Sequence, residues 1–272
     1  MKEFQKIIKY VAIAFGIYLA ITIISIIVGV IGAIFTGIYG VQMITEQTSI
    51  ERMDEELVFS EFSKLEVEIF ATNLNIKTEG QEFKVETFQV PETTKIENKD
   101  GKLIIKDSKK FTYKNESSIT IYIPENTKLE KINLDIGAGR VNIEKLDVKD
   151  ANFDFGAGSV EIKNMKSEKT DIECGAGQVK IADSELTNTD LDAGVGKLEF
   201  TGYIKGNSQV NCGIGEVILN LEGGKDLYTI RAEKGIGDIK INDESVSNES
   251  TTGTGENRIS VEGGIGNIKI KM

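Results

Sequence analysis

The sequence contains no histidine and no tryptophan, and it has only two cysteines and two prolines in 272 residues. Without histidine the chain cannot form a histidine-based catalytic triad, a histidine acid–base pair or a histidine-ligated metal site. It also lacks a phosphate-binding loop in the strand-to-helix context that such a loop requires. We therefore predict that the protein is not an enzyme, with no catalytic residue, cofactor or metal site.

Positive charge is also scarce, because 32 lysines and arginines stand against 43 aspartates and glutamates, which gives a formal net charge of −11. A field of this sign repels nucleic acids and other polyanions and attracts cations or basic partners. We therefore exclude direct nucleic-acid binding.

Glycine, in contrast, is abundant, with 28 residues, and much of it falls in Gly-x-Gly steps that recur through the C-terminal half. The first four intervals between steps are 19 residues each, and the last two are 22 and 29. A fixed period of this size is typical of a stacked repeat architecture. The seven steps begin at Gly137, Gly156, Gly175, Gly194, Gly213, Gly235 and Gly264.

Apolar and polar residues alternate on both sides of each glycine step, as in strands with one buried face. The parity of the apolar residues changes at the step: Leu134 and Ile136 precede it in one phase, and Val141 and Ile143 follow it in the other. A corner or bulge at the glycines keeps both strands apolar side in. We predict an all-β fold, a single-chain β-solenoid with rungs of about 19 residues. The alternative is an antiparallel meander with one hairpin per repeat, which the absence of a consistent Asn-Gly or Asp-Gly turn disfavours.

The N-terminus has a different character, because no charged side chain occurs between Tyr10 and Thr45. About 20 apolar residues suffice for a helix to cross a membrane. Lysines precede this segment and mainly acidic residues follow it, which predicts a cytoplasmic N-terminus at residues 1–9, one transmembrane helix at 10–45 and an extracytoplasmic solenoid. The length argues against a cleaved signal peptide. A helical hairpin is the alternative, and it would place the solenoid in the cytoplasm.

Small residues within this segment, Gly29, Ala33 and Gly37, recur at four-residue spacing. Such spacing lets membrane helices approach closely and predicts a homodimer through the membrane helix, although glycine is common in membrane helices generally. We interpret residues 46–57 as a juxtamembrane linker and 58–272 as the solenoid domain. Within it, 58–133 are degenerate first rungs, including an imperfect copy of the repeat at 71–76, and 134–272 are the Gly-x-Gly repeats; a polar loop at 245–257 interrupts the last one.

The segments Ser118–Pro124, Leu129–Leu134 and Gly137–Ile143 together resemble the bacterial putative-adhesin family, the toastrack domains of unknown function. The resemblance covers roughly residues 60–272. It implies a β-helix-like fold, often tethered by an N-terminal membrane helix, at the cell surface, with a part in adhesion or envelope sensing. The family supplies no catalytic residues to transfer.

One column of outward positions is a candidate binding surface. The carboxylates Asp135, Asp154, Glu173 and Asp192 each stand two residues before a glycine step and would form a row along the stack, which we expect Asn211 to end. Opposed like charges destabilise a sheet, so such a row could attract calcium or a basic partner. The alternative is a solvated face, with lysines such as Lys163 and Lys180 compensating the charge.

The two cysteines, Cys174 and Cys212, occupy the same inward repeat position two rungs apart. Two rungs separate their backbones by about 9.6 Å, beyond the roughly 7 Å that a disulfide allows. We therefore expect two small buried side chains rather than a bridge.

The leading functional hypothesis is a membrane-anchored extracytoplasmic module for interaction, adhesion or envelope sensing, whose partner is an envelope protein or the cell wall. A carbohydrate-active β-helix enzyme is one alternative, but its basic candidates Arg140 and Lys197 would lie three rungs apart. A self-assembling scaffold, in which solenoid ends stack, is the other.

Overall fold

The computed structural model describes residues 52–107, 117–247 and 249–272, which belong to one compact unit beginning at Ile50. The predicted cytoplasmic N-terminus, the transmembrane helix at 10–45 and the first half of the linker, 46–51, lie outside these residues. Within the described ranges, no helix has the length and apolar character needed to cross a membrane. The helical structure found there is one 3₁₀ turn, η1 (Lys225–Leu227).

The described chain is all-β. Its N-terminal strands are β1 (Arg52–Met53), β2 (Glu56–Phe59), β3 (Lys64–Ala71), β4 (Asn73–Thr78), β5 (Phe83–Phe88), β6 (Val90–Pro91), β7 (Lys95–Lys99), β8 (Lys102–Lys106) and β9 (Ser118–Ile123). The long strands that follow are β10 (Leu129–Ile143), β11 (Leu146–Lys163), β12 (Met165–Thr187), β13 (Thr189–Lys205), β14 (Asn207–Leu221), β15 (Tyr228–Ile241) and β18 (Asn257–Lys271), with the short β16 (Glu244–Ser245) and β17 (Ser250–Thr252) between the last two.

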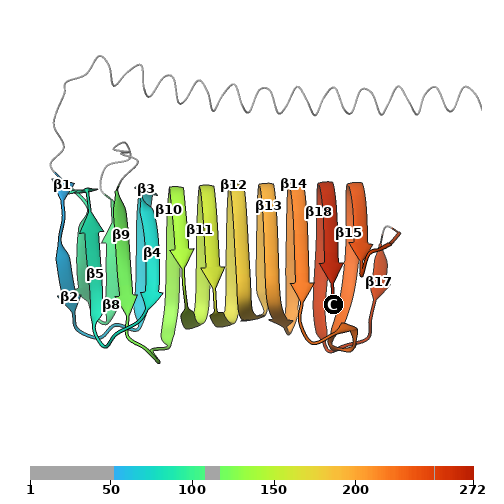
Figure 1. Ribbon diagram of the computed structural model, residues 1–272, viewed down its shortest axis with the longest axis horizontal. Helices are drawn as coiled ribbons and strands as arrows, with labels where there is room; N and C mark the ends of the chain where they lie inside the picture. Colours follow the sequence, from blue (N-terminus) through green and yellow to red (C-terminus); the bar gives the residue numbers. More distant parts are fainter. Residues whose placement is uncertain (1–51, 108–116, 248) are drawn as a thin grey trace, which may run out of the picture. The chain divides into compact units, whose positions relative to one another are not determined.

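The long strands stack in parallel and in register, so that each residue of β10 to β13 pairs with the residue 19 positions later, except beyond an irregularity near Ile181. Figure 1 shows these strands side by side as successive rungs of one sheet. This parallel register agrees with the solenoid prediction and excludes the antiparallel meander for the repeats. Parallel pairing follows from the repeat itself, because equal rungs place identical apolar positions above one another.

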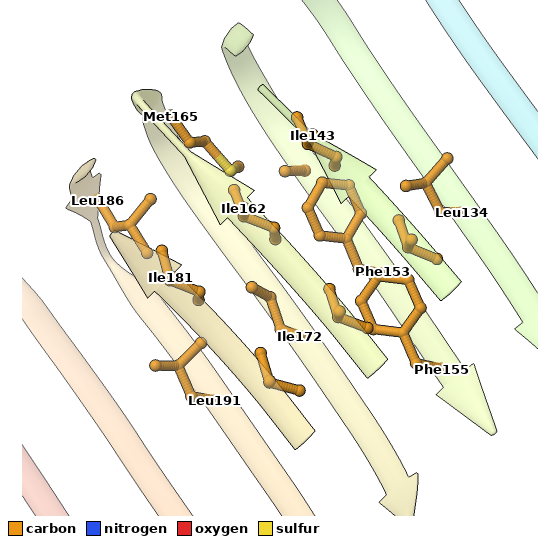
Figure 2. Packing of buried hydrophobic residues seen from close by; sticks show 14 of the residues in the cluster. Leu134, Ile143, Phe153, Phe155, Ile162, Met165, Ile172, Ile181, Leu186 and Leu191 are labelled. Carbon is orange, nitrogen blue, oxygen red and sulfur yellow. The ribbon is translucent and has the colours of Figure 1, made fainter. Parts of the chain in front are cut away.

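Each rung turns three short apolar segments inward. In β11 these contain Leu146 and Val148, then Phe153 and Phe155, then Val160 and Ile162, all of them buried. Figure 2 shows the corresponding side chains of neighbouring rungs, among them Leu134, Phe153, Ile172 and Leu191, packed in rows through the interior. Burial of these rows is the main stabilising contribution, since apolar burial provides about 25 cal/mol per Å².

The Gly-x-Gly step forms a corner between the second and third inward segments, where the parity changes as predicted. Gly177, the second glycine of its step, has a φ of +140°, a conformation that side-chain-bearing residues rarely adopt. A Cβ placed on Gly175, the first glycine, would lie 2.6 Å from the carbonyl oxygen of Gly156 in the rung below. Both glycines are therefore required, whereas the residue between them, such as Ala176, is exposed.

The last two repeats do not stack in sequence order. The C-terminal strand β18 pairs in parallel with β14 on one side and with β15 on the other, so β15 forms the final long rung. The segment between them, which sequence analysis interpreted as a polar loop at 245–257, contributes β16 and β17, and both pair antiparallel to the outer edge of β15. Val246 of this segment packs against the core. The insertion therefore covers part of the open end of the stack.

The N-terminal end combines parallel rungs with antiparallel strands. β3 and β4 pair in parallel with the two halves of β10, which aligns Ala71 with Ala138 and Leu74 with Val141. β8 and β9 continue the parallel stack beyond β3 and β4. In contrast, β2, β5 and β7 run antiparallel to their neighbours and close this end. Residues 58–133 are thus partly degenerate rungs and partly an antiparallel cap that the repeat pattern does not predict.

Candidate functional site

The four carboxylates singled out in the sequence lie in one row on the outside of the stack. Asp135 pairs in register with Asp154, Asp154 with Glu173, and Glu173 with Asp192. Their neighbours in the strand, such as Phe155, point into the core, so the alternation of the strand directs every carboxylate outward. We call the surface formed by the strand segments that precede the glycine steps the first face.

The row is longer than predicted. At one end Glu68 of β3 pairs with Asp135. At the other end Asn211 donates a hydrogen bond from its amide to Asp192, at 2.6 Å, and is followed by Glu262 and then Glu233. The expectation that Asn211 ends the row was wrong, because β18 and β15 carry the same repeat position two rungs further.

A second row runs beside the first, two residues earlier in each strand. It contains Glu66, Asn133, Asn152, Asp171, Asp190 and Gln209. Partial burial, together with repulsion from Asp190 and Asp192, raises the pKa of Asp171. Partial burial, with repulsion from Asp154 and Glu68, likewise raises the pKa of Asp135. At Asp135 and Asp171 the first face therefore holds negative charge at a cost in stability, whereas at its β3 end Lys106 pairs with Glu66 and Glu68.

The strand segments after the glycine steps carry a different charge pattern, and we call their surface the second face. Here the carboxylates are paired: Glu216 lies 2.7 Å from the ammonium of Lys269 and 3.8 Å from that of Lys197, and Glu161 lies 2.9 Å from Lys163. The pKa values of Glu216 and Glu161 are lowered by these lysines. Because Lys163 pairs with Glu161, it does not compensate the carboxylate row as the sequence analysis allowed.

A shallow groove of about 430 Å³ lies on the first face near β3, β10 and β11. It is lined by carboxylates of both rows, including Glu66, Asp135 and Asp154. The side-chain oxygen of Asn133 is buried here without a hydrogen-bond partner. In the part of the chain that the structure describes, no three carboxylate or thiol side chains converge closely enough to hold a metal ion. The arrangement suits the distributed attraction of positive charge rather than coordination of one ion.

Other sequence candidates are separated by the stack or hidden in it. Arg140 and Lys197 share a register position and are separated by Ser159 and Gln178, so they do not form a compact pair. Cys174 and Cys212 are buried and unpaired, with Ala193 between them. Burial raises the pKa of both thiols, which makes them poor nucleophiles.

Sequence reasoning missed two surface features near the C-terminal end. The middle residues of the last glycine steps are aliphatic, and Val195 and Ile236 are 53% and 71% exposed. A hollow on the outer surface of β14, β18 and β15 is lined by Arg231 and Arg258, two of only four arginines in the chain. The scarcity of arginine was a usable signal, but the strand exchange that brings these two together was not visible in the repeat.

The architecture defines a parallel β-solenoid with charged outer faces. A family model described as Toastrack DUF4097 matches residues 62–271, and the chain belongs to this family. No match was found among curated proteins.

Among solved structures, one described as a putative adhesin from Bacteroides fragilis is 19% identical and has a TM-score of 0.51; the alignment covers 83% of this chain and 100% of that one. A putative cell adhesion protein from Clostridium sporogenes is 20% identical with a TM-score of 0.39, and the alignment covers 81% of this chain and 99% of that one. The similarity to the Bacteroides fragilis structure supports the assignment of the fold.

Proposed function

We propose that the protein is a non-enzymatic, membrane-anchored module that presents its solenoid outside the cytoplasmic membrane and binds a positively charged component of the cell envelope through the first face. The observation that carries the proposal is the contrast between the two faces. On the first face Asp135 and Asp171 have negative neighbours along the stack, and lysines pair with the carboxylates Glu66 and Glu68 at the β3 end. On the second face lysines pair with Glu161 and Glu216 in the middle and at the C-terminal end of the stack.

This contrast matters because like charges in register destabilise a sheet. Exposed carboxylates can be paired with lysines at little cost in stability, and the second face contains such pairs. The row on the first face retains electrostatic repulsion between neighbouring strands, and binding of a positively charged partner would relieve that repulsion. Membership of the Toastrack family and the description of a structural neighbour as a putative adhesin support an interaction role. The lysines before Tyr10 and the acidic residues after Thr45 support an extracytoplasmic position.

The proposal is tested by co-sedimentation of the full-length protein, in detergent micelles, with cell-envelope fragments. A first-face variant combines Asp154→Asn, Glu173→Gln and Asp192→Asn. The matched control removes three carboxylates from the second face, with Glu161→Gln, Glu199→Gln and Glu216→Gln. We expect salt-sensitive sedimentation of the wild type, at least a tenfold loss for the first-face variant and little change for the control.

Equal losses in the two variants would show that only overall charge matters. Unchanged sedimentation of the first-face variant would exclude this face as the binding surface. A polysaccharide-cleaving or nucleotide-hydrolysing activity that a single substitution abolishes would contradict the non-enzymatic assignment.

A further inference from the structure

The hollow near the C-terminal end is built from two adjacent rows of outward side chains. Its first row consists of Asn207, Arg258 and Thr229, and its second of Gln209, Ser260 and Arg231, each in register across β14, β18 and β15. Asp190 of β13 extends the second row by one rung, and Thr251 of β17 lines the rim. The hollow has a volume of about 520 Å³.

The two arginines give this hollow a positive end in an otherwise acidic protein. Arg231 pairs with Glu233 on the same strand. The backbone N–H of the exposed Arg258 donates a hydrogen bond to the carbonyl oxygen of Gly206, but its guanidinium has no hydrogen-bond or ion-pair partner among the residues that the structure describes. A guanidinium presents a planar fork that matches a carboxylate in a two-point contact, so Arg258 is available for an anionic group.

The remaining lining favours a hydroxyl-rich ligand. Asn207, Gln209, Thr229 and Ser260 offer amide and hydroxyl groups that both donate and accept hydrogen bonds. Ile259, the apolar residue of the lining, is buried, and no aromatic side chain lines the hollow. An apolar peptide or a lipid chain would find little surface to bury against, whereas a sugar would find polar partners across three rungs.

The far end of the hollow limits how much negative charge a ligand can carry. Asp190 lies two rungs from Arg258, or about 10 Å along the stack at the usual strand spacing. This distance exceeds the Debye length of about 8 Å at physiological ionic strength, so the two ends act separately on a bound molecule. A second carboxylate beside Asp190 would be repelled, whereas a sugar hydroxyl there could donate a hydrogen bond to it.

We infer that this hollow binds a glycan segment that carries a single carboxylate, with the carboxylate on Arg258 and neutral sugar hydroxyls extending towards Asp190. The inference extends the proposed function, because an extracytoplasmic position would bring the hollow into contact with envelope glycans. Binding in solution does not depend on that position. The hollow shares Asp190 and Gln209 with the second row of the first face, but no residue changed in the first-face variant lines it. Failure of the proposed function can therefore be distinguished experimentally from failure of this inference.

The test is calorimetric titration of the full-length protein in detergent micelles with three disaccharides: a glucuronosyl-glucose with one carboxylate, neutral cellobiose and digalacturonate with two carboxylates. We expect glucuronosyl-glucose to bind at least tenfold more tightly than the other two. Arg258→Gln should remove this preference, whereas Arg140→Gln, which removes an exposed arginine elsewhere on the stack, should retain it. Asp190→Asn should improve the binding of digalacturonate.

Unchanged melting temperatures of the exposed-site variants would establish that they are folded. Absence of binding by all three sugars would overturn the inference, as would equal losses in Arg258→Gln and Arg140→Gln. Tighter binding of a short glutamate-rich peptide than of glucuronosyl-glucose would show that the site recognises acidic peptides instead.

Discussion

The glycine steps show how one residue type satisfies two separate requirements. The second glycine of each step adopts a positive φ, and both glycines leave room for the carbonyl group of the neighbouring rung. The residue between them meets neither requirement, which explains why it varies from alanine to valine and isoleucine along the stack.

Replacing Gly177 with alanine should lower the free energy of unfolding by more than about 3 kcal/mol, because backbone strain and overlap with the carbonyl oxygen of Gly158 add together. The control is Gly80→Ala, where φ is +76° but no atom lies within 4 Å of the added Cβ. That change should cost about 1 kcal/mol. Chemical denaturation measures both, and equal costs would show that close packing at the corner contributes nothing.

Neighbouring residues on a strand should respond very differently to substitution. Phe155 is 3% exposed and packs beside Phe153, so Phe155→Asp should destabilise the stack by more than about 4 kcal/mol, through lost apolar burial and an unpaired buried charge. Asp154→Asn should leave stability unchanged or slightly higher. Thermal melts of the two variants decide this point, and comparable losses would mean that the inward and outward faces are assigned incorrectly.

At the scale of the strand, the carboxylate rows make stability depend on pH. Burial and repulsion raise the pKa of Asp135 in the folded state, so stability is reduced above that pKa and recovers as pH falls towards the unfolded value of about 3.9. Asp135→Asn should therefore stabilise the protein by about 0.5 kcal/mol at pH 7. The gain should disappear below about pH 3.9.

Glu66 serves as the opposite control, because hydrogen bonds from Lys102 and Lys106 lower its pKa. The contribution of the ionised Glu66 to the stability of the fold is present above the unfolded pKa, and it is lost as pH falls through the lowered pKa of the folded state. Glu66→Gln should thus destabilise the protein at pH 7. Urea denaturation across this pH range measures both effects, and a destabilising Asp135→Asn at pH 7 would contradict the account of the rows.

The order of the final strands illustrates what a repeat pattern cannot predict. The copies ending at Ile241 and Ile270 have the same apolar alternation, so either fits beside β14 equally well by pattern alone. The long connection between them allows β18 to return and insert between β14 and β15. Equal spacing predicted the parallel register of the regular rungs, but the exchange depends on tertiary packing.

At the scale of the whole molecule, the sequence predicted the solenoid and the outward carboxylates because both follow from local periodicity. The antiparallel cap formed by β2, β5 and β7 was not predicted, since strands without the repeat carry no register signal. The hollow containing Arg231 and Arg258 was missed for a related reason. It combines residues from β13, β14, β15, β17 and β18, whose proximity only the folded chain reveals.

The central claim, that the solenoid is displayed outside the cytoplasmic membrane, is tested most directly by labelling intact cells with a membrane-impermeant maleimide. The native cysteines are buried, so labelling reports an introduced one. Full-length Ala176→Cys, at an exposed corner, should be labelled in intact cells, whereas Gln5→Cys should be labelled only after lysis. Labelling of Ala176→Cys only after lysis would contradict the claim and favour a helical hairpin with the solenoid in the cytoplasm.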